Sequence, residues 1–199
     1  MKHRPVLDVS ALPDHAFGPR MTMWWGTLAF CVLEGTGFAL AGGAYLYLVW
    51  LNQLWPLADA PPGMLWSGVI TAGLVLSVWP NHLVGVAAKG EDLPRVRRLL
   101  LVMSAIGLAI LVGRAFEFGT LYVRWDQNAY GSIVWALLGL HTAHILTDVV
   151  DTWVVTALMF TRHGHGKRFS DVEDNAFYWN FVVLSWLPIY VLIYWASRM

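Results

Sequence analysis

The chain has 199 residues, of which 57% are hydrophobic and 13% are charged, and its formal net charge is zero. A soluble domain carries about 25% charged residues, so this composition excludes an ordinary water-soluble domain and indicates a membrane protein. The lack of net positive charge argues against nucleic acid as a partner. The single cysteine, Cys31, excludes an internal disulfide and a cysteine-based metal cluster.

Five apolar stretches follow a polar N-terminal arm, residues 1–21, which contains three prolines. Each is close to or longer than the about 20 residues that a helix needs to cross a bilayer. Twelve tryptophans support a membrane location, because tryptophan concentrates where lipid meets water. The sequence therefore predicts an all-α fold in which residues 22–199 form one domain, a bundle of five transmembrane helices. The predicted spans are about Met23–Trp50, Met64–Ala88, Leu99–Val123, Tyr130–Phe160 and Ala176–Ala196, with Lys89–Arg98 and Arg162–Asn175 as polar loops.

Lysine and arginine are distributed unevenly between the two ends of these spans. Ten lie in the arm, in the loop after the second span and in the loop after the fourth, whereas the opposite side has only Arg124 and Arg198. Basic residues collect on the cytoplasmic side of membrane proteins, which predicts a cytoplasmic N-terminal arm and an external C-terminus. The ten residues are Lys2, Arg4, Arg20, Lys89, Arg95, Arg97, Arg98, Arg162, Lys167 and Arg168.

The first span contains a lone carboxyl, Glu34, among apolar and small residues. A carboxyl in such surroundings is protonated or hydrogen-bonded. We interpret it as a neutral acid bonded to a neighbouring helix, with a proton-relay group as the alternative. Small residues nearby allow another backbone or a lipid tail to approach closely. The predicted lipid-facing small-residue surface consists of Gly35, Gly37, Gly42 and Gly43.

The fourth span carries His141, His144, Asp148 and Asp151 at spacings of 3, 4 and 3, which an α-helix gathers on one face. A charge at the centre of a membrane helix costs roughly 2.5–3.5 kcal/mol, so this face must look toward other helices or water. Two histidines three apart could share a metal with neighbouring carboxylates. Haem would need a ligand from a second helix, and His82 lies near the cytoplasmic end of its span. Hydrogen-bonded structural histidines are the preferred interpretation.

The third span carries Arg114 and Glu117, three apart and so on one helix face. They predict an ion pair that fixes helix packing, since no nucleophile stands nearby in sequence. We therefore predict no catalytic, cofactor or metal site in this chain. The expected intramembrane polar network consists of Glu34, His82, Arg114, Glu117, His141, His144 and Asp148.

Several motifs, taken together and in this order, resemble subunit III of the haem–copper oxidases in a five-helix form. The resemblance covers about residues 22–198. The motifs are W-G-T-L-A-F-C-V-L-E-G (Trp25–Gly35), V-W-P-N-H-L-V-G-V-A-A-K-G (Val78–Gly90), R-A-F-E-F (Arg114–Phe118), D-Q-N-A-Y-G-S (Asp126–Ser132) with G-L-H-T-A-H (Gly139–His144), and F-Y-W-N-F-V-V-L-S-W (Phe177–Trp186).

The chain departs from the family pattern at five positions. Asn81 and Asn180 each stand where the family has a histidine, Arg114 where it has glutamine, and Val183 where it has aspartate. Asp148 stands where a small residue is more usual. These departures suggest a divergent branch with a rearranged set of internal hydrogen bonds.

The resemblance implies a non-catalytic subunit that packs on oxidase subunit I, contacts subunit II and other chains of the complex, and binds phospholipid. Haem and copper are then expected in partner subunits and none in this chain. Such a subunit supports proton uptake and stability during oxygen reduction by a cytochrome c or quinol oxidase. The implied location is the bacterial inner (plasma) membrane, crossed several times.

Three alternatives stay open at this point. The first is a subunit III-like accessory protein of a nitric oxide reductase, which the departures from the family pattern favour. The second is a small haem-binding membrane cytochrome that uses His82, His141 and His144 as ligands. The third is an independent proton-coupled carrier, which the absence of an inverted repeat or of a pair of broken helices disfavours.

Overall fold

The computed structural model describes residues 22–52, 54–57, 60–162, 164, 166 and 168–198. The predicted N-terminal arm, with Lys2, Arg4 and Arg20, lies outside the described residues, as does Lys167. The described part contains five helices that are long and apolar enough to cross a membrane, and no strand, so the predicted all-α five-helix fold is confirmed. They are α1 (Thr22–Leu51), α2 (Met64–Lys89), α3 (Leu93–Gly119), α4 (Ala129–Phe160) and α5 (Arg168–Tyr190).

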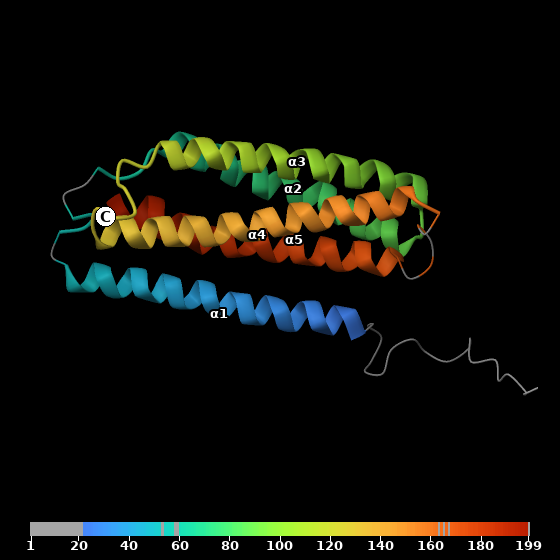
Figure 1. Cartoon of the computed structure of the whole chain (residues 1–199), viewed down its shortest axis with the longest axis horizontal. Coiled ribbons are helices and arrows are strands. Elements are labelled where there is room, and N and C mark those ends of the chain that lie inside the picture. The colour runs from blue at the N-terminus through green and yellow to red at the C-terminus, as the bar shows by residue number, and fades with distance from the viewer. Residues whose placement is uncertain are drawn as a thin grey trace, which may run out of the picture.

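The helices run along the long axis of the molecule, with α4 and α5 between the α2–α3 pair and α1 (Figure 1). Helix α1 lies at one edge and packs mainly against α4 and α5. Its buried residues, Cys31, Phe38 and Tyr45, are seven apart and form one narrow seam. Most other residues of α1 are apolar and exposed, as expected for a helix whose other faces meet lipid or another protein in the membrane.

Helix α3 begins at Leu93 and ends at Gly119, earlier at both ends than the predicted span Leu99–Val123. The Asp92 carboxylate accepts a hydrogen bond from the Arg95 amide at 3.1 Å and so caps the helix inside the polar segment. Hydropathy detects only the part of a helix that lies in lipid, so it missed these polar first turns.

Helix α5 begins at Arg168, so the prediction of a loop up to Asn175 is wrong for its last eight residues. Phe169 and Val172 in this segment are buried against the bundle. Their packing stabilises a helix whose other face is polar, which an apolar window cannot recognise.

The C-terminal end of α5 changes its geometry after Pro188, whose ring lacks a backbone donor. A π-helical turn follows over Val191–Trp195, and a 3₁₀ turn over Ala196–Arg198. The Arg198 guanidinium donates to the carbonyl oxygens of Tyr194 and Pro62, which ties this end of the chain to the segment before α2.

Close approach between segments depends on two glycines. A Cβ atom on Gly107 of α3 would lie 2.6 Å from Val149 Cγ2 of α4, closer than packed atoms come. At the start of α4, the Asn128 side chain accepts from the Gly131 amide at 2.8 Å, and a Cβ on Gly131 would lie 2.1 Å from the Arg124 carbonyl oxygen. A larger residue at either position would push the neighbouring segments apart.

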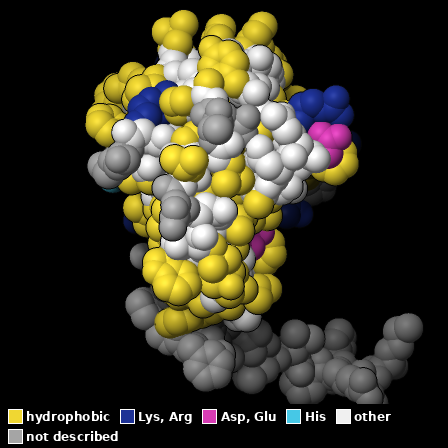
Figure 2. Space-filling model, turned by 90° about the vertical axis from the view of Figure 1, so that its left-hand side faces the viewer, with side chains coloured by type: hydrophobic (Ala, Val, Ile, Leu, Met, Phe, Trp, Pro, Cys, Tyr) yellow, Lys and Arg dark blue, Asp and Glu magenta, His cyan; other side chains and the backbone are white. Residues whose placement is uncertain are grey.

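One end of the bundle, the basic end, collects most of the described lysines and arginines. It contains the start of α1, the α2–α3 turn and the α4–α5 connection (Figure 1). Figure 2 views the opposite end, where hydrophobic and uncharged side chains cover most of the surface. This asymmetry is the one on which the predicted cytoplasmic N-terminus rests, and that orientation remains a prediction. The described basic residues at the basic end are Lys89, Arg95, Arg97, Arg98, Arg162 and Arg168.

Candidate functional site

Glu34 is the only charged residue of α1, and it contacts α4 and α5. The Tyr178 hydroxyl of α5 donates to Glu34 Oε2 at 2.7 Å, and His144 Nε2 of α4 lies 3.3 Å from Glu34 Oε1. The side chains of Glu34 and His144 are only 16% and 12% exposed. The prediction that Glu34 is hydrogen-bonded to neighbouring helices is confirmed.

The two ring nitrogens of His144 face different groups. Nδ1 lies 2.6 Å from the Leu140 carbonyl oxygen of the same helix. Because a carbonyl only accepts, Nδ1 donates this hydrogen bond. Nε2 is then the ring nitrogen that faces Glu34 Oε1, so the imidazole bridges its own helix and α1.

Asp148 lies toward the basic end from this pair and is fully buried. Its Oδ1 accepts from Asn175 Nδ2 of α5 at 3.3 Å, and its Oδ2 has no hydrogen-bond partner within the described ranges. Asn175 Nδ2 also donates to Asp151 Oδ2 at 2.9 Å, so one amide connects two carboxyl groups of α4. An ionised carboxylate with so few donors would cost several kcal/mol to bury, which favours the protonated acid.

A second network lies nearer the opposite end of the bundle and is centred on Arg114 of α3. Arg114 Nη1 lies 2.5 Å from Glu117 Oε2, and both side chains are buried, so the predicted ion pair is confirmed. The Tyr194 hydroxyl donates to the other oxygen, Glu117 Oε1. The guanidinium carbon of Arg114 lies 4.1 Å from the centre of the Trp186 ring, a distance at which a cation is attracted to the ring face.

His141 belongs to this second network and not to the one that holds His144. Its Nε2 lies 3.0 Å from the Val182 carbonyl oxygen and therefore donates, so Nδ1 accepts from Arg114 Nη2 at 3.1 Å. His141 thus uses both ring nitrogens in hydrogen bonds, whereas His144 uses Nδ1 in a hydrogen bond and Nε2 in the contact with Glu34. Among the residues described, no three His, Cys, Asp or Glu side chains are grouped so as to hold a metal ion. The geometry is consistent with hydrogen-bonded structural histidines.

Two of the departures from the family pattern contact each other. Asn81 Nδ2 of α2 donates to Asn180 Oδ1 of α5 at 3.1 Å and to the Ala176 carbonyl oxygen at 2.7 Å. The pair joins α2 to α5 through two amides. His82 lies apart, exposed on α2 in a crevice with Lys89, and it joins neither buried network.

The predicted lipid-facing surface corresponds in part to an apolar groove of about 550 Å³ between α1 and α5. Gly35, Gly42 and Gly43 line it on the α1 side. Gly37 does not line it, and a Cβ atom at this position would have no neighbour within 4 Å. The α5 side of the groove is formed by Phe181, Leu184, Ser185, Pro188, Ile189 and Leu192.

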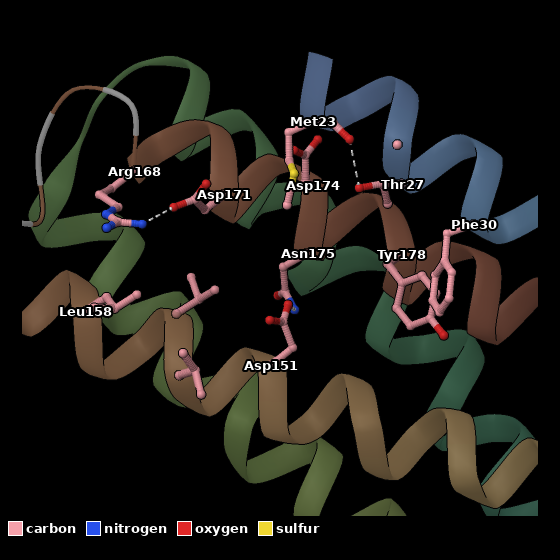
Figure 3. A pocket seen from close by; sticks show the side chains of 13 residues that line it. Met23, Thr27, Phe30, Asp151, Leu158, Arg168, Asp171, Asp174, Asn175 and Tyr178 are labelled. Atoms are coloured by element: carbon pink, nitrogen blue, oxygen red, sulfur yellow. Dashed lines mark hydrogen bonds and ion pairs between the residues drawn. The ribbon is translucent and has the colours of Figure 1, made fainter. Parts of the chain in front are cut away.

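A pocket of about 540 Å³ lies at the basic end between α1, α4 and α5 (Figure 3). Asp151 and Asn175 lie on its floor with their side chains against each other, and Arg168 and Asp171 form an ion pair at its side. Tyr178, which also bonds Glu34, stands at the opposite wall beside Phe30. The pocket therefore borders both parts of the Glu34 and Asp148 network.

Comparison with known proteins decides the family to which these motifs belong. The family model described as "Cytochrome c oxidase subunit III" matches residues 81–198, which is more than half of the chain. The chain belongs to this family. Membership implies a multi-pass membrane subunit of the respiratory chain that works in a complex with other oxidase subunits.

Relatives of this subunit span most of its length. The chain is 24% identical over 188 residues to cytochrome c oxidase subunit 3 of Thermostichus vulcanus, covering 93% of the chain and 92% of the relative. It is 26% identical over 196 residues to the subunit 3 of Synechocystis sp., covering 94% and 83%. The mouse protein is 26% identical over 153 residues, covering 73% of the chain and 56% of the mouse subunit. The resemblance drawn from the motifs is therefore confirmed.

Sequence reasoning missed the residues of α5 and of the π-helical turn after it that complete the subunit's networks. Asn175, Tyr178 and Tyr194 supply donors to the three internal carboxyl groups, and Trp186 supplies the ring beneath Arg114. Asn175 was missed because it fell in a predicted loop. The three aromatic residues lie in an apolar span, where only their polar tips could have indicated buried partners.

Proposed function

We propose that this chain is the non-catalytic subunit III of a haem–copper terminal oxidase and supports proton uptake and durability during oxygen reduction. The observation that carries the proposal is that every internal acid and histidine of the buried networks bonds to a neighbouring helix. Side chains engaged in this way fix the helices and hold protons, which suits a subunit that supports a neighbouring catalytic chain. Haem and copper are then expected in the partner subunits.

A second part of the proposal is that phospholipid binds in the groove between α1 and α5. The groove is apolar, and its volume of about 550 Å³ falls within the range of ligand pockets, roughly 300–1,000 Å³. Gly35, Gly42 and Gly43 remove side chains from one wall, so an acyl chain can lie against the backbone of α1. An acyl chain in the groove would add apolar contact between α1, which has only one narrow packing seam, and α5.

The proposed partners are oxidase subunit I as the main contact, together with subunit II and other chains of the complex. Many large apolar side chains on the outside of the bundle are exposed, and in a membrane they can meet either lipid or helices of such partners. Bacterial relatives from Thermostichus vulcanus and Synechocystis sp. support a bacterial inner membrane as the location. With the basic end in the cytoplasm, Glu34, Asp148 and the acidic pocket lie toward the side from which an oxidase takes up protons.

Co-purification tests the assignment. A tagged chain, extracted from its native membrane in mild detergent, should bring down oxidase subunits I and II together with haem absorbance. Recovery of nitric oxide reductase chains would favour that accessory role instead. A haem spectrum in the chain separated from all partners would refute the cofactor-free subunit.

Within the purified oxidase, Glu34→Gln tests the role in proton uptake. The amide keeps the size of the side chain and can still accept from Tyr178, but it cannot exchange a proton. We expect slower proton uptake and a shorter active lifetime during turnover. Uptake and lifetime equal to those of the wild type would restrict Glu34 to helix packing.

A further inference from the structure

We propose that the pocket at the basic end is the mouth of a proton-exchange route inside this subunit, in which Asn175 controls passage between Asp151 and the buried acid Asp148. The physiological meaning of this route rests on the proposed role in proton uptake. The route itself carries protons between water in the pocket and side chains of this chain, so it can be tested without an oxidase assay.

The pocket has the charge and the volume to place water beside Asp151. It measures about 540 Å³, and Asp151 itself is exposed to it. Asp151, Asp171 and Asp174 line it, against the single cation Arg168, whose Nη1 lies 2.9 Å from Asp171 Oδ2 (Figure 3). Because carboxyl groups outnumber the cation among these lining residues, the pocket carries negative potential, which raises the local concentration of protons.

Asn175 stands between the exposed acid and the buried one. Its Nδ2 lies 2.9 Å from Asp151 Oδ2 and 3.3 Å from Asp148 Oδ1, so the two N–H groups of the amide can serve both carboxyl groups at once. The Asn175 side chain therefore fills the space through which a proton would pass from one carboxyl to the other.

The Thr152 hydroxyl allows two alternative hydrogen-bond patterns around the Asn175 amide. The Thr152 hydroxyl lies 3.3 Å from Asn175 Oδ1 and 3.1 Å from Asn175 Nδ2, so it can donate to the first or accept from the second. When it donates, both N–H groups remain on the carboxyl groups. When it accepts, one N–H turns to Thr152 and one carboxyl loses its donor. The longer and weaker bond is the one to Asp148, so Asp148 is the carboxyl that is released.

Asp148 is the final proton acceptor of the route, because its surroundings stabilise an ionised carboxylate least. It is fully buried, and its Oδ2 has no partner in the part of the chain that the structure describes. It lies within electrostatic range of both Asp151 and Glu34, so its charge affects the electrostatic environment of the Glu34–His144 contact. An ionised Asp148 would be repelled by two other acids and stabilised by only one weak hydrogen-bond donor, whereas protonation removes the repulsion.

The exchange balances as a simple proton transfer. A hydronium ion in the pocket gives a proton to the Asp151 carboxylate and leaves water, Asn175 moves aside, and Asp151 passes the proton to the Asp148 carboxylate and becomes ionised again. The reverse sequence discharges Asp148. The titratable and charged groups that face this path are Cys31 and Glu34 of α1, His144 of α4, and Arg168, Asp171, Asp174 and Tyr178 of α5.

Infrared spectroscopy of the detergent-solubilised full chain, within its native complex, tests the route directly. The carbonyl stretching band of a protonated carboxyl shifts on exchange into D₂O, and loss of one band in Asp148→Asn assigns it. We expect Asn175→Leu to slow the exchange of this band by about tenfold or more, because Leu fills the same space but cannot form the alternative Thr152 hydrogen bonds that let the side chain move aside. Gly26→Leu, which places a side chain at the pocket wall where a Cβ has no neighbour within 4 Å, should slow it as well.

Gly37→Leu is the matched control. Gly37 is on the same helix and also has no neighbour within 4 Å of a Cβ, but it lines neither this pocket nor the α1–α5 groove, so exchange should keep the wild-type rate. Wild-type exchange in both Asn175→Leu and Gly26→Leu would overturn the route, as would an Asp148→Asn spectrum that loses no protonated band. If Asn175→Leu does not fold, Thr152→Val removes the hydroxyl switch and should slow exchange in its place. If the variants slow exchange at Asp148 but leave proton uptake by the oxidase unchanged, the route exists in this subunit and its role in uptake is refuted.

Discussion

The Arg114–Glu117 pair offers the sharpest test of the packing argument, because both charges are buried and three further groups depend on them. Removing the carboxylate in Glu117→Leu leaves the guanidinium with Trp186 and His141 as its remaining contacts. Breaking a buried ion pair from one side costs about 3–5 kcal/mol. The Tyr194 hydroxyl also loses its acceptor, which adds about 1–3 kcal/mol. We therefore expect Glu117→Leu to lower the free energy of unfolding by about 4–8 kcal/mol.

The double variant Arg114→Met with Glu117→Leu should recover part of this loss. It removes both charges and fills their volume with apolar side chains, a replacement that is often neutral or stabilising. Only the Tyr194 hydroxyl and His141 Nδ1 then lose a partner, at about 1–3 kcal/mol each, so the expected cost falls to about 2–6 kcal/mol. The ordering of the three proteins is therefore wild type, double variant, single variant, from most to least stable.

Reversible unfolding by SDS, followed by tryptophan fluorescence in mixed micelles, measures these free energies. The exposed pair Arg124–Asp126 supplies the control, since its side chains are 76% and 41% exposed. Asp126→Leu should change the free energy of unfolding by less than about 1 kcal/mol. If the double variant loses as much stability as Glu117→Leu, the two charges do not act as a pair and the reasoning fails.

Three further predictions follow from single contacts. Gly107→Ala should lower the free energy of unfolding by about 1–3 kcal/mol, because its Cβ would lie 2.6 Å from Val149 Cγ2, and adding Val149→Ala should restore part of the loss in the same SDS titration. Asn81→Leu should cost about 1–3 kcal/mol by leaving the Asn180 amide without its partner, and the double replacement with Asn180→Leu should cost less than the single one. Gly42→Leu should fill the α1–α5 groove and reduce the phospholipid that co-purifies with the complex, measured by mass spectrometry.

The groove prediction has a matched control in Gly37→Leu, because Gly37 is on the same helix but does not line the groove. Equal lipid content in both variants would show that lipid does not bind there. For the helix contacts, a Gly107→Ala variant as stable as the wild type would mean that α3 and α4 can separate at no cost. The direct pairing of Asn81 and Asn180 would be contradicted if the double variant lost more free energy of unfolding than the two single variants lose together.

Element boundaries show where hydropathy suffices and where it does not. The apolar parts of all five helices were predicted, because crossing a bilayer demands a long apolar run that no local contact can replace. The polar first turns of α3 and α5 were missed. In α3 they depend on the Asp92 cap, and in α5 on the burial of Phe169 and Val172 against other helices. Both are features outside the lipid, where composition gives little guidance.

The polar residues show the same division within the membrane. Their presence and their preference for inward positions were predictable, because an uncompensated charge in lipid is too costly. Their grouping was not. The spacing of His141 and His144 places both on one face of α4, yet His141 contacts α3 and α5 whereas His144 contacts α1. A helix face is wide enough to meet two neighbours, so three-residue spacing alone cannot separate one network from two.

By itself, the sequence determined that this protein is a five-helix membrane bundle of the subunit III family, since apolar runs and motifs are properties of neighbouring residues. Only the tertiary structure decided that Asn81 pairs with Asn180, that Tyr194 completes the Arg114–Glu117 pair, and that Asn175 joins Asp148 to Asp151. Each of those contacts depends on the rotation and depth of one helix relative to another. Side-chain packing along the whole bundle fixes these two quantities, and no local stretch of sequence contains them.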